Sequence, residues 1–112
     1  MDRFLWAASG DKRRLRLADL CQFTLRGVLM INCGTEVGLS QKRGIHQVNS
    51  HFGILEESRL PMPWGREQDG DLLWFYQGLI HPRRTHPAQV SGQWESLLAD
   101  PHALAYSWTD DQ

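Results

Sequence analysis

The sequence predicts an α+β domain in which an antiparallel sheet is packed on one face by C-terminal helices. Three patterns predict it: polar and apolar residues alternate along the first half, an aromatic run follows near 72–80, and apolar residues recur at helical spacing after Pro87. Strands followed by helices are typical of this class. With 112 residues, 41% of them apolar and 22% charged, the chain is expected to form a single globular domain over 1–112.

The first half predicts strands because seven apolar residues between 15 and 31 fall on odd positions and polar residues fall on several of the even ones. A strand with one buried and one wet face requires this period of two. Asp19 and Gly27 interrupt the pattern and indicate a turn or a bulge. A helix over 17–31 fits fewer positions and would enclose Gly27. The apolar odd positions are Leu15, Leu17, Cys21, Phe23, Leu25, Leu29 and Ile31.

The segment 44–58 has two interpretations. Its apolar residues recur at helical spacing, which favours an amphipathic helix. Gly53 would lie inside that helix, and the Asn-Ser pair at 49–50 equally suits a turn between two short strands. We expect the helix.

The last third predicts one strand and two helices. Asp69-Gly70 reads as a turn, and the run Leu72–Ile80 reads as a strand that is apolar on both faces. After Pro87 the apolar spacing predicts a helix over about 87–100. Asp100-Pro101 fits an N-cap followed by proline at the first helical position, which predicts a second helix over about 101–108.

An aromatic-lined site for a small apolar or anionic ligand is expected between the sheet and the helices. Tryptophan and tyrosine side chains wall such pockets, and arginine pairs with phosphate or carboxylate through two parallel hydrogen bonds. Histidine supplies a polar group that titrates near neutral pH. The candidate ligand-binding residues are Trp64, Trp74, Tyr76, His81, Arg83 and His86.

The dense basic cluster near the N-terminus is the candidate for nucleic-acid binding. It contains Lys12, Arg13, Arg14 and Arg16. Contacts to phosphate need such cations. Four charges are few, however, and 12 Lys and Arg against 13 Asp and Glu give a net charge of −1. We therefore do not expect nucleic acid to be the partner, and the cluster is read as the exposed side of an edge strand.

Metal, cofactor and catalytic motifs are not expected. The histidine pairs 46/51 and 81/86 are five residues apart, which suits neither a helical nor a strand ligand pair. Cys21 and Cys33 are too far apart for a zinc pair and are expected to be buried, reduced thiols. Without a secretory signal or a membrane-spanning run, the cytoplasm is the expected location.

These patterns predict a small, non-catalytic binding or interaction protein. We expect it to self-associate as a dimer through the aromatic strand at 72–80, because both faces of that strand are apolar. The alternative is a small enzyme or ligand-binding protein that uses the aromatic-lined pocket. Weak nucleic-acid binding through residues 12–16 ranks third.

Overall fold

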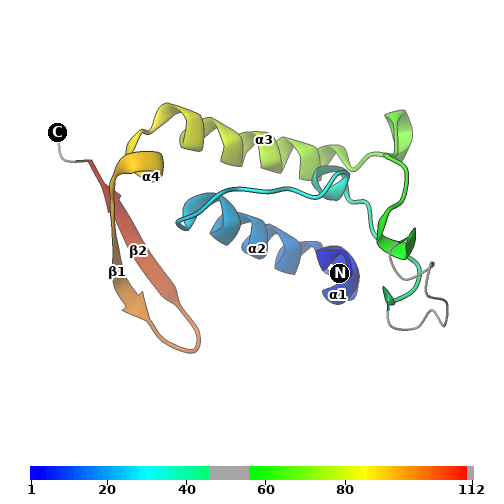
Figure 1. The fold of residues 1–112 in the computed structure, drawn as a ribbon, viewed down its shortest axis with the longest axis horizontal. Coiled ribbons are helices and arrows are strands. Elements are labelled where there is room, and N and C mark those ends of the chain that lie inside the picture. Colours follow the sequence, from blue (N-terminus) through cyan, green and yellow to red (C-terminus); the bar gives the residue numbers. More distant parts are fainter. Residues whose placement is uncertain (46–55, 111–112) are drawn as a thin grey trace.

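The computed structural model describes residues 1–45 and 56–110. Two long helices lie side by side and run in the same direction, and a β-hairpin stands at one end of this pair (Figure 1). Short 3-10 helices occupy Thr35–Val37, Glu56–Ser58 and Gly65–Glu67. The longer elements are α1 (Phe4–Ala7), α2 (Lys12–Thr24), α3 (Gly70–Thr85), α4 (Ala88–Ser91), β1 (Gln93–Ala99) and β2 (Leu104–Thr109).

The predicted strand in the region of α2 is wrong. Asp11 caps this helix, because its carboxylate accepts a hydrogen bond from the backbone N–H of Arg13 at 2.9 Å. Leu15, Asp19 and Phe23 are buried at spacings of four residues and form the inner face of the helix. All three positions are odd, so the alternation that suggested a strand is equally a helical stripe.

The predicted strand over 72–80 is also wrong, because these residues belong to α3. The Asp69-Gly70 pair begins the helix instead of closing a turn: Asp69 Oδ1 accepts from the N–H of Leu72 at 3.0 Å. Leu72 and Tyr76 are buried four residues apart. Tyr76 meets Phe23 of α2 edge-to-face, with ring centroids 5.8 Å apart, which joins the two helices.

The two predicted C-terminal helices are wrong as well, because most of that region forms an antiparallel hairpin. Gln93 pairs with Thr109, Ala99 pairs with Leu104, and the ladder is irregular between Ser96 and Leu98. Asp100 does not cap a helix. Its Oδ1 accepts from the N–H groups of His102 and Ala103, both at 2.7 Å, and thereby closes the loop of the hairpin.

Helices and a two-stranded antiparallel sheet confirm the α+β class, but not the arrangement predicted for it. The central part of the predicted helix 44–58 lies outside the described residues. Cys21 and Cys33 are both free thiols, but Cys33 is exposed, contrary to the expected burial. Among the described residues, no helix is long and apolar enough to cross a bilayer.

The Asp69 carboxylate is expected to stabilise the fold through two contacts, the cap of α3 and an ion pair with Lys12 Nζ at 2.6 Å. Asp69→Ala should lower the free energy of unfolding by about 1 kcal/mol, the usual cost of a lost N-cap. Asp69→Asn keeps a capping oxygen and loses only the ion pair, so it should cost less. Urea unfolding followed by circular dichroism measures both.

This contribution should depend on pH. Lys12, and then the N–H of Leu72, lower the pKa of Asp69 below its ordinary value. The stabilisation is therefore complete above the unfolded-state pKa of about 3.9 and is lost as the pH falls through the lower folded-state pKa. A difference between wild type and Asp69→Ala that stays constant down to about pH 2 would contradict this assignment.

Candidate functional site

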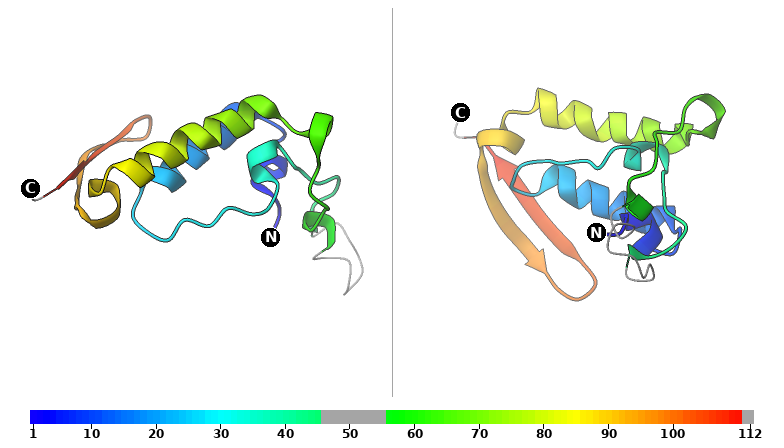
Figure 2. Two further views of the ribbon diagram at one scale, coloured as in Figure 1. Left: turned by 90° about the horizontal axis from the view of Figure 1, so that it is seen from above. Right: turned by 45° about the vertical axis from the view of Figure 1, so that its right-hand side comes forward.

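An extended segment, residues 28–33, connects the end of α2 to the loop that leads to α3. It runs opposite to both helices and follows the pair along one side (Figures 1 and 2). Leu29 and Ile31 pack against the buried cluster between the helices. Val28 and Met30 point away from it and are 97% and 80% exposed. The segment therefore has the alternating faces of a β-strand.

The backbone of this segment is not paired as a strand would be. No N–H of residues 28–31 donates a hydrogen bond to another described residue. One of its carbonyl groups, that of Met30, accepts from the side chain of Gln22 at 2.6 Å. Gly34 then turns the chain with a φ of +87°, and a Cβ there would lie 2.6 Å from Leu39 Cδ2.

Two cavities flank the extended segment, one on the side of each long helix. A cavity of about 710 Å³ is bordered by α1, α2 and residues 30–33. A smaller one of about 260 Å³ is bordered by α3 together with Ile31 and Cys33. Tyr76 borders both cavities. The segment thus has open space along both of its edges.

Arg3 fixes the N-terminal end of the larger cavity. Its Nε and Nη1 donate to the carbonyl oxygens of Ser58 and Cys33, both at 2.9 Å, and its backbone N–H donates to Gln41 Oε1 at 2.6 Å. Burial lowers the pKa of Arg3, while the nearby Cys33 and Glu36 raise it. The residue is only 4% exposed, so it ties the start of the chain to loops that are distant in sequence.

Three buried oxygen atoms around Tyr76 lack hydrogen-bond partners within the described part of the chain. They are Asp19 Oδ2 on α2, Glu36 Oε2 and the Tyr76 hydroxyl. Desolvation raises the pKa of Asp19, an effect that the nearby Tyr76 hydroxyl partly offsets. Desolvation and the neighbouring Asp19 both raise the pKa of Tyr76. A buried polar atom without a partner is rare in a complete fold, because leaving it unpaired costs free energy.

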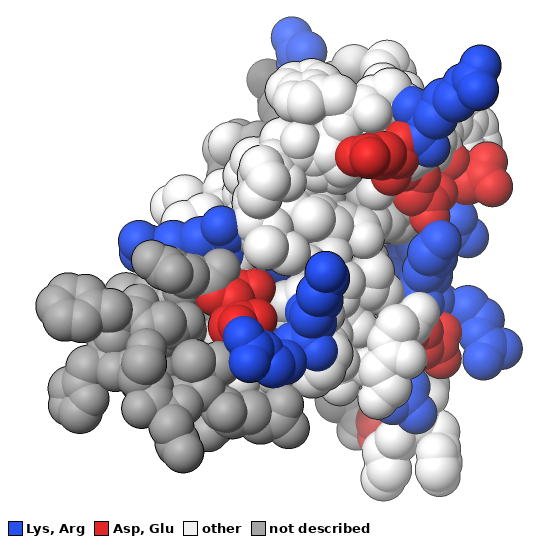
Figure 3. Space-filling view, turned by 90° about the vertical axis from the view of Figure 1, so that its right-hand side faces the viewer, with Lys and Arg blue, Asp and Glu red and all other residues white. Residues whose placement is uncertain are grey.

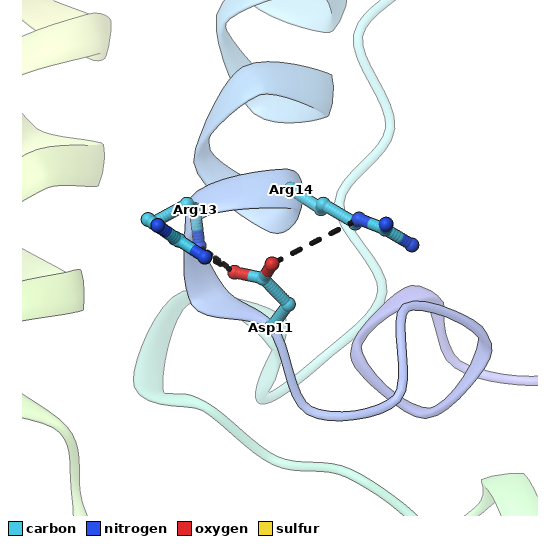
Figure 4. Close-up of polar contacts among 3 residues, drawn as sticks. All are labelled: Asp11, Arg13 and Arg14. Carbon is cyan, nitrogen blue, oxygen red and sulfur yellow. Dashed lines mark hydrogen bonds and ion pairs between the residues drawn. The ribbon is translucent and has the colours of Figure 1, made fainter.

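The basic cluster predicted as a nucleic-acid site is largely engaged within the chain. Asp11 lies between Arg13 Nε at 3.4 Å and Arg14 Nε at 3.8 Å (Figure 4). Lys12 pairs with Asp69, and Arg16 lies over the Phe75 ring. Basic and acidic side chains are interspersed on the face shown in Figure 3. Nucleic-acid binding by these residues stays a prediction.

The six predicted ligand-binding residues are distributed along α3 and beside it. Trp64 and Trp74 are 74% and 76% exposed, whereas Tyr76 is 1% exposed and faces the core. His81 lies in a shallow hollow on α3 with Arg84. Arg83 ties α3 to the end of α2, because it donates to the carbonyls of Phe23 and Gly27 at 2.7 and 3.0 Å. His86 caps the helix through Pro82 O.

These positions separate Tyr76 from the two tryptophans, so the expected pocket between a sheet and helices is not formed by them. Ligand binding by the six residues stays a prediction. The sequence reasoning missed Arg3, Asp19 and Glu36 as a group. The one signal in the sequence was Asp19, a carboxylate at an otherwise apolar position, which was read as a break between strands.

No family model matches the chain. The chain is 40% identical to alpha-amylase 2 of Dictyoglomus thermophilum over 100 residues, which are 88% of the chain and 17% of that protein. It is 38% identical to a cyclomaltodextrinase of a Bacillus species, over 98% of the chain and 18% of the enzyme. Neopullulanase 2 of Thermoactinomyces vulgaris is 31% identical, over 96% and 17% respectively.

Solved structures also match nearly the whole chain. A cyclomaltodextrinase superposes with a TM-score of 0.80 and 36% identity, over 99% of this chain and 18% of its own. A protein from Thermus thermophilus gives a TM-score of 0.79 and 26% identity, over 96% and 20%. The chain therefore spans about a sixth to a fifth of the length of the proteins it matches.

These matches overturn the predicted function. The chain was expected to be a non-catalytic interaction protein that self-associates, with a small ligand-binding protein or enzyme as the alternative. Nearly its whole length instead resembles a part of proteins named as an alpha-amylase, a cyclomaltodextrinase and a neopullulanase. The aromatic strand on which the dimer prediction rested is helix α3.

The desolvated Asp19 carboxyl is expected to destabilise the isolated chain at neutral pH. Asp19→Asn should raise the free energy of unfolding at neutral pH by about 1–3 kcal/mol, because an amide, unlike an ionised carboxyl, loses no charge hydration on burial. Because the folded-state pKa is raised, ionisation of the carboxyl costs no stability below the unfolded pKa of about 3.9. Its cost grows as the pH rises from there to the folded pKa. Urea unfolding of both proteins across this range measures the difference.

The control is Asp71→Asn, since Asp71 is exposed at the start of α3. It should show no such pH-dependent gain. An Asp19→Asn protein that is less stable than the wild type at neutral pH would show that the carboxylate is paired.

Proposed function

We propose that this chain forms one α/β segment of a larger glycoside hydrolase that acts on α-linked glucans. The support comes from the relatives, which are enzymes by name and match 88–98% of the chain. In this proposal the chain helps to build the fold of the enzyme, and the remaining 82–83% of each relative's length corresponds to the rest of that fold (100 less 17 or 18).

The observation that carries the proposal is the extended segment between α2 and α3. Two helices that run the same way, joined by a strand that runs opposite to both, are the repeating unit of a parallel α/β sheet. Strands of such sheets are apolar on both faces, as the run from Val28 to Ile31 is. They also pair along both edges, and here both edges border cavities. The segment thus has the chemistry of an interior strand whose neighbours belong to other parts of the enzyme.

Glycoside hydrolysis generally needs two carboxyl groups that flank the scissile bond. Several acids of this chain already have structural partners. Asp11 and Asp69 cap helices, Asp100 closes the hairpin loop, and Glu57 pairs with Arg43 at 2.5 Å. Because the chain matches only 17–18% of each relative's length, we propose that the catalytic pair lies outside these 112 residues, and we expect the isolated chain to hydrolyse no glucan.

A chimeric enzyme tests this proposal. In alpha-amylase 2 of Dictyoglomus thermophilum, the matched 100 residues are replaced by the corresponding residues of this chain. The chimera should hydrolyse soluble starch, measured by the release of reducing ends, because the two segments share a fold. The isolated chain, assayed alongside, should release none.

Two variants of the chimera serve as matched controls. Leu72→Asp places a charge at a fully buried position and should abolish activity, whereas Val90→Asp changes a residue that is 70% exposed and should leave it intact. A chimera that unfolds cooperatively but is inactive on starch would contradict the proposal. Starch hydrolysis by the isolated chain would contradict the assignment of the catalytic carboxylates to the rest of the enzyme.

A further inference from the structure

We infer that the larger cavity receives a lysine or arginine side chain from the part of the enzyme that covers it, and that Asp19 is its binding partner. This inference rests on the proposed function, because it assumes that another part of a glycoside hydrolase lies against the segment 28–33. In this inference, the interface contains one ion pair, between Asp19 and the incoming lysine or arginine, among otherwise apolar contacts.

The position of Asp19 favours a contact from outside the chain. Asp19 lies in the middle of α2, borders the larger cavity and is 3% exposed. Much of the cavity wall is apolar and includes Phe4, Leu15 and Met30. A carboxyl group in such a wall loses its hydration, and its Oδ2 gains no hydrogen bond from any described residue in exchange.

The charge around Tyr76 favours a cation as the missing partner. Two acids, Asp19 and Glu36, have an unpartnered oxygen there. Arg3 is the cation at this end of the cavity, and its Nε and Nη1 are already bonded to carbonyl oxygens. Arg16, one turn before Asp19 on α2, lies over the Phe75 ring at 5.5 Å, and its Nε is also buried without a partner among the described residues. Two carboxyl oxygens thus stand against one guanidinium nitrogen among these unpartnered atoms, and a further cation would balance them.

Asp2, another acid of the cavity wall, does not provide a competing site. Its Oδ1 accepts from Gln41 and, at 2.8 Å, from the N–H of Ile45. Desolvation raises the pKa of Asp19, and the Tyr76 hydroxyl lies close enough to offset part of this rise, so both side chains face the same bound group. An ammonium or guanidinium group entering the cavity would thus meet a carboxyl and a phenol together.

The test measures the effect of one substitution on stability in two proteins, the isolated chain and the chimera, and expects opposite effects. In the isolated chain Asp19→Leu should stabilise the fold, because it removes a desolvated carboxyl group. In the starch-hydrolysing chimera the same change should shorten the half-life of activity at elevated temperature about tenfold, because it leaves the incoming cation buried without a partner. Asp19→Asn, which is nearly isosteric, should also shorten it, since an amide does not neutralise a cation.

Asp71→Leu is the matched control, because it removes an exposed aspartate at the start of α3. It should leave the half-life of the chimera within about twofold, as expected for a surface substitution. An Asp19→Leu chimera that lives as long as the parent chimera, or longer, would overturn the inference. A loss with Asp19→Leu but not with Asp19→Asn would also overturn it, because a neutral donor would then be the partner. Failure of the parent chimera to hydrolyse starch would instead be failure of the proposed function.

Discussion

The backbone N–H groups of residues 28–31 need hydrogen-bond partners, and the described part of the chain does not supply them. This apolar stretch lies between two helices that share its inner face, and its N–H groups find no partner among the described residues. Backbone groups of an apolar strand are paired in complete folds, since water cannot reach them once both faces are covered. The open edges, the two flanking cavities and the exposed Val28 and Met30 all fit the proposal that neighbouring strands lie outside this chain.

The two long helices explain how the segment keeps its shape without strand partners. Phe23 and Tyr76 pack between α2 and α3, and Arg83 bonds to the end of α2. The hairpin is held at the same end, because Trp108 Nε1 donates to Thr24 O at 2.6 Å. These contacts form a layer of two helices, and Leu29 and Ile31 pack against the buried cluster between them. The polar side chains around Tyr76 border the two cavities. In our proposal, the hydrogen bonding of Asp19 and Glu36 is therefore completed by the part of the enzyme that covers these cavities.

The α+β class could be predicted from the sequence, but which segments form helices and which form strands could not. Leu15, Asp19 and Phe23 are spaced by four, which satisfies a period of two as well as a helical one. In α3, the four-residue spacing of Leu72 and Tyr76 indicates a helix, but residues 73–75 between them are also apolar, so the run was interpreted as a buried strand. Aspartate followed by glycine or proline was read for its commonest role, and both readings failed: Asp69 caps a helix and Asp100 closes a hairpin. The cluster of Arg3, Asp19 and Glu36 could not be predicted from local sequence patterns, because these residues are distant in the sequence and meet only in the folded chain.

Amide hydrogen exchange at residues 28–31 tests the central claim most directly. It is measured by mass spectrometry on the isolated chain and on the starch-hydrolysing chimera. If these residues form an interior strand of a larger sheet, their amides should exchange at nearly the unprotected rate in the isolated chain and become strongly protected in the chimera. Strong protection already in the isolated chain, or no protection in an active chimera, would contradict the account.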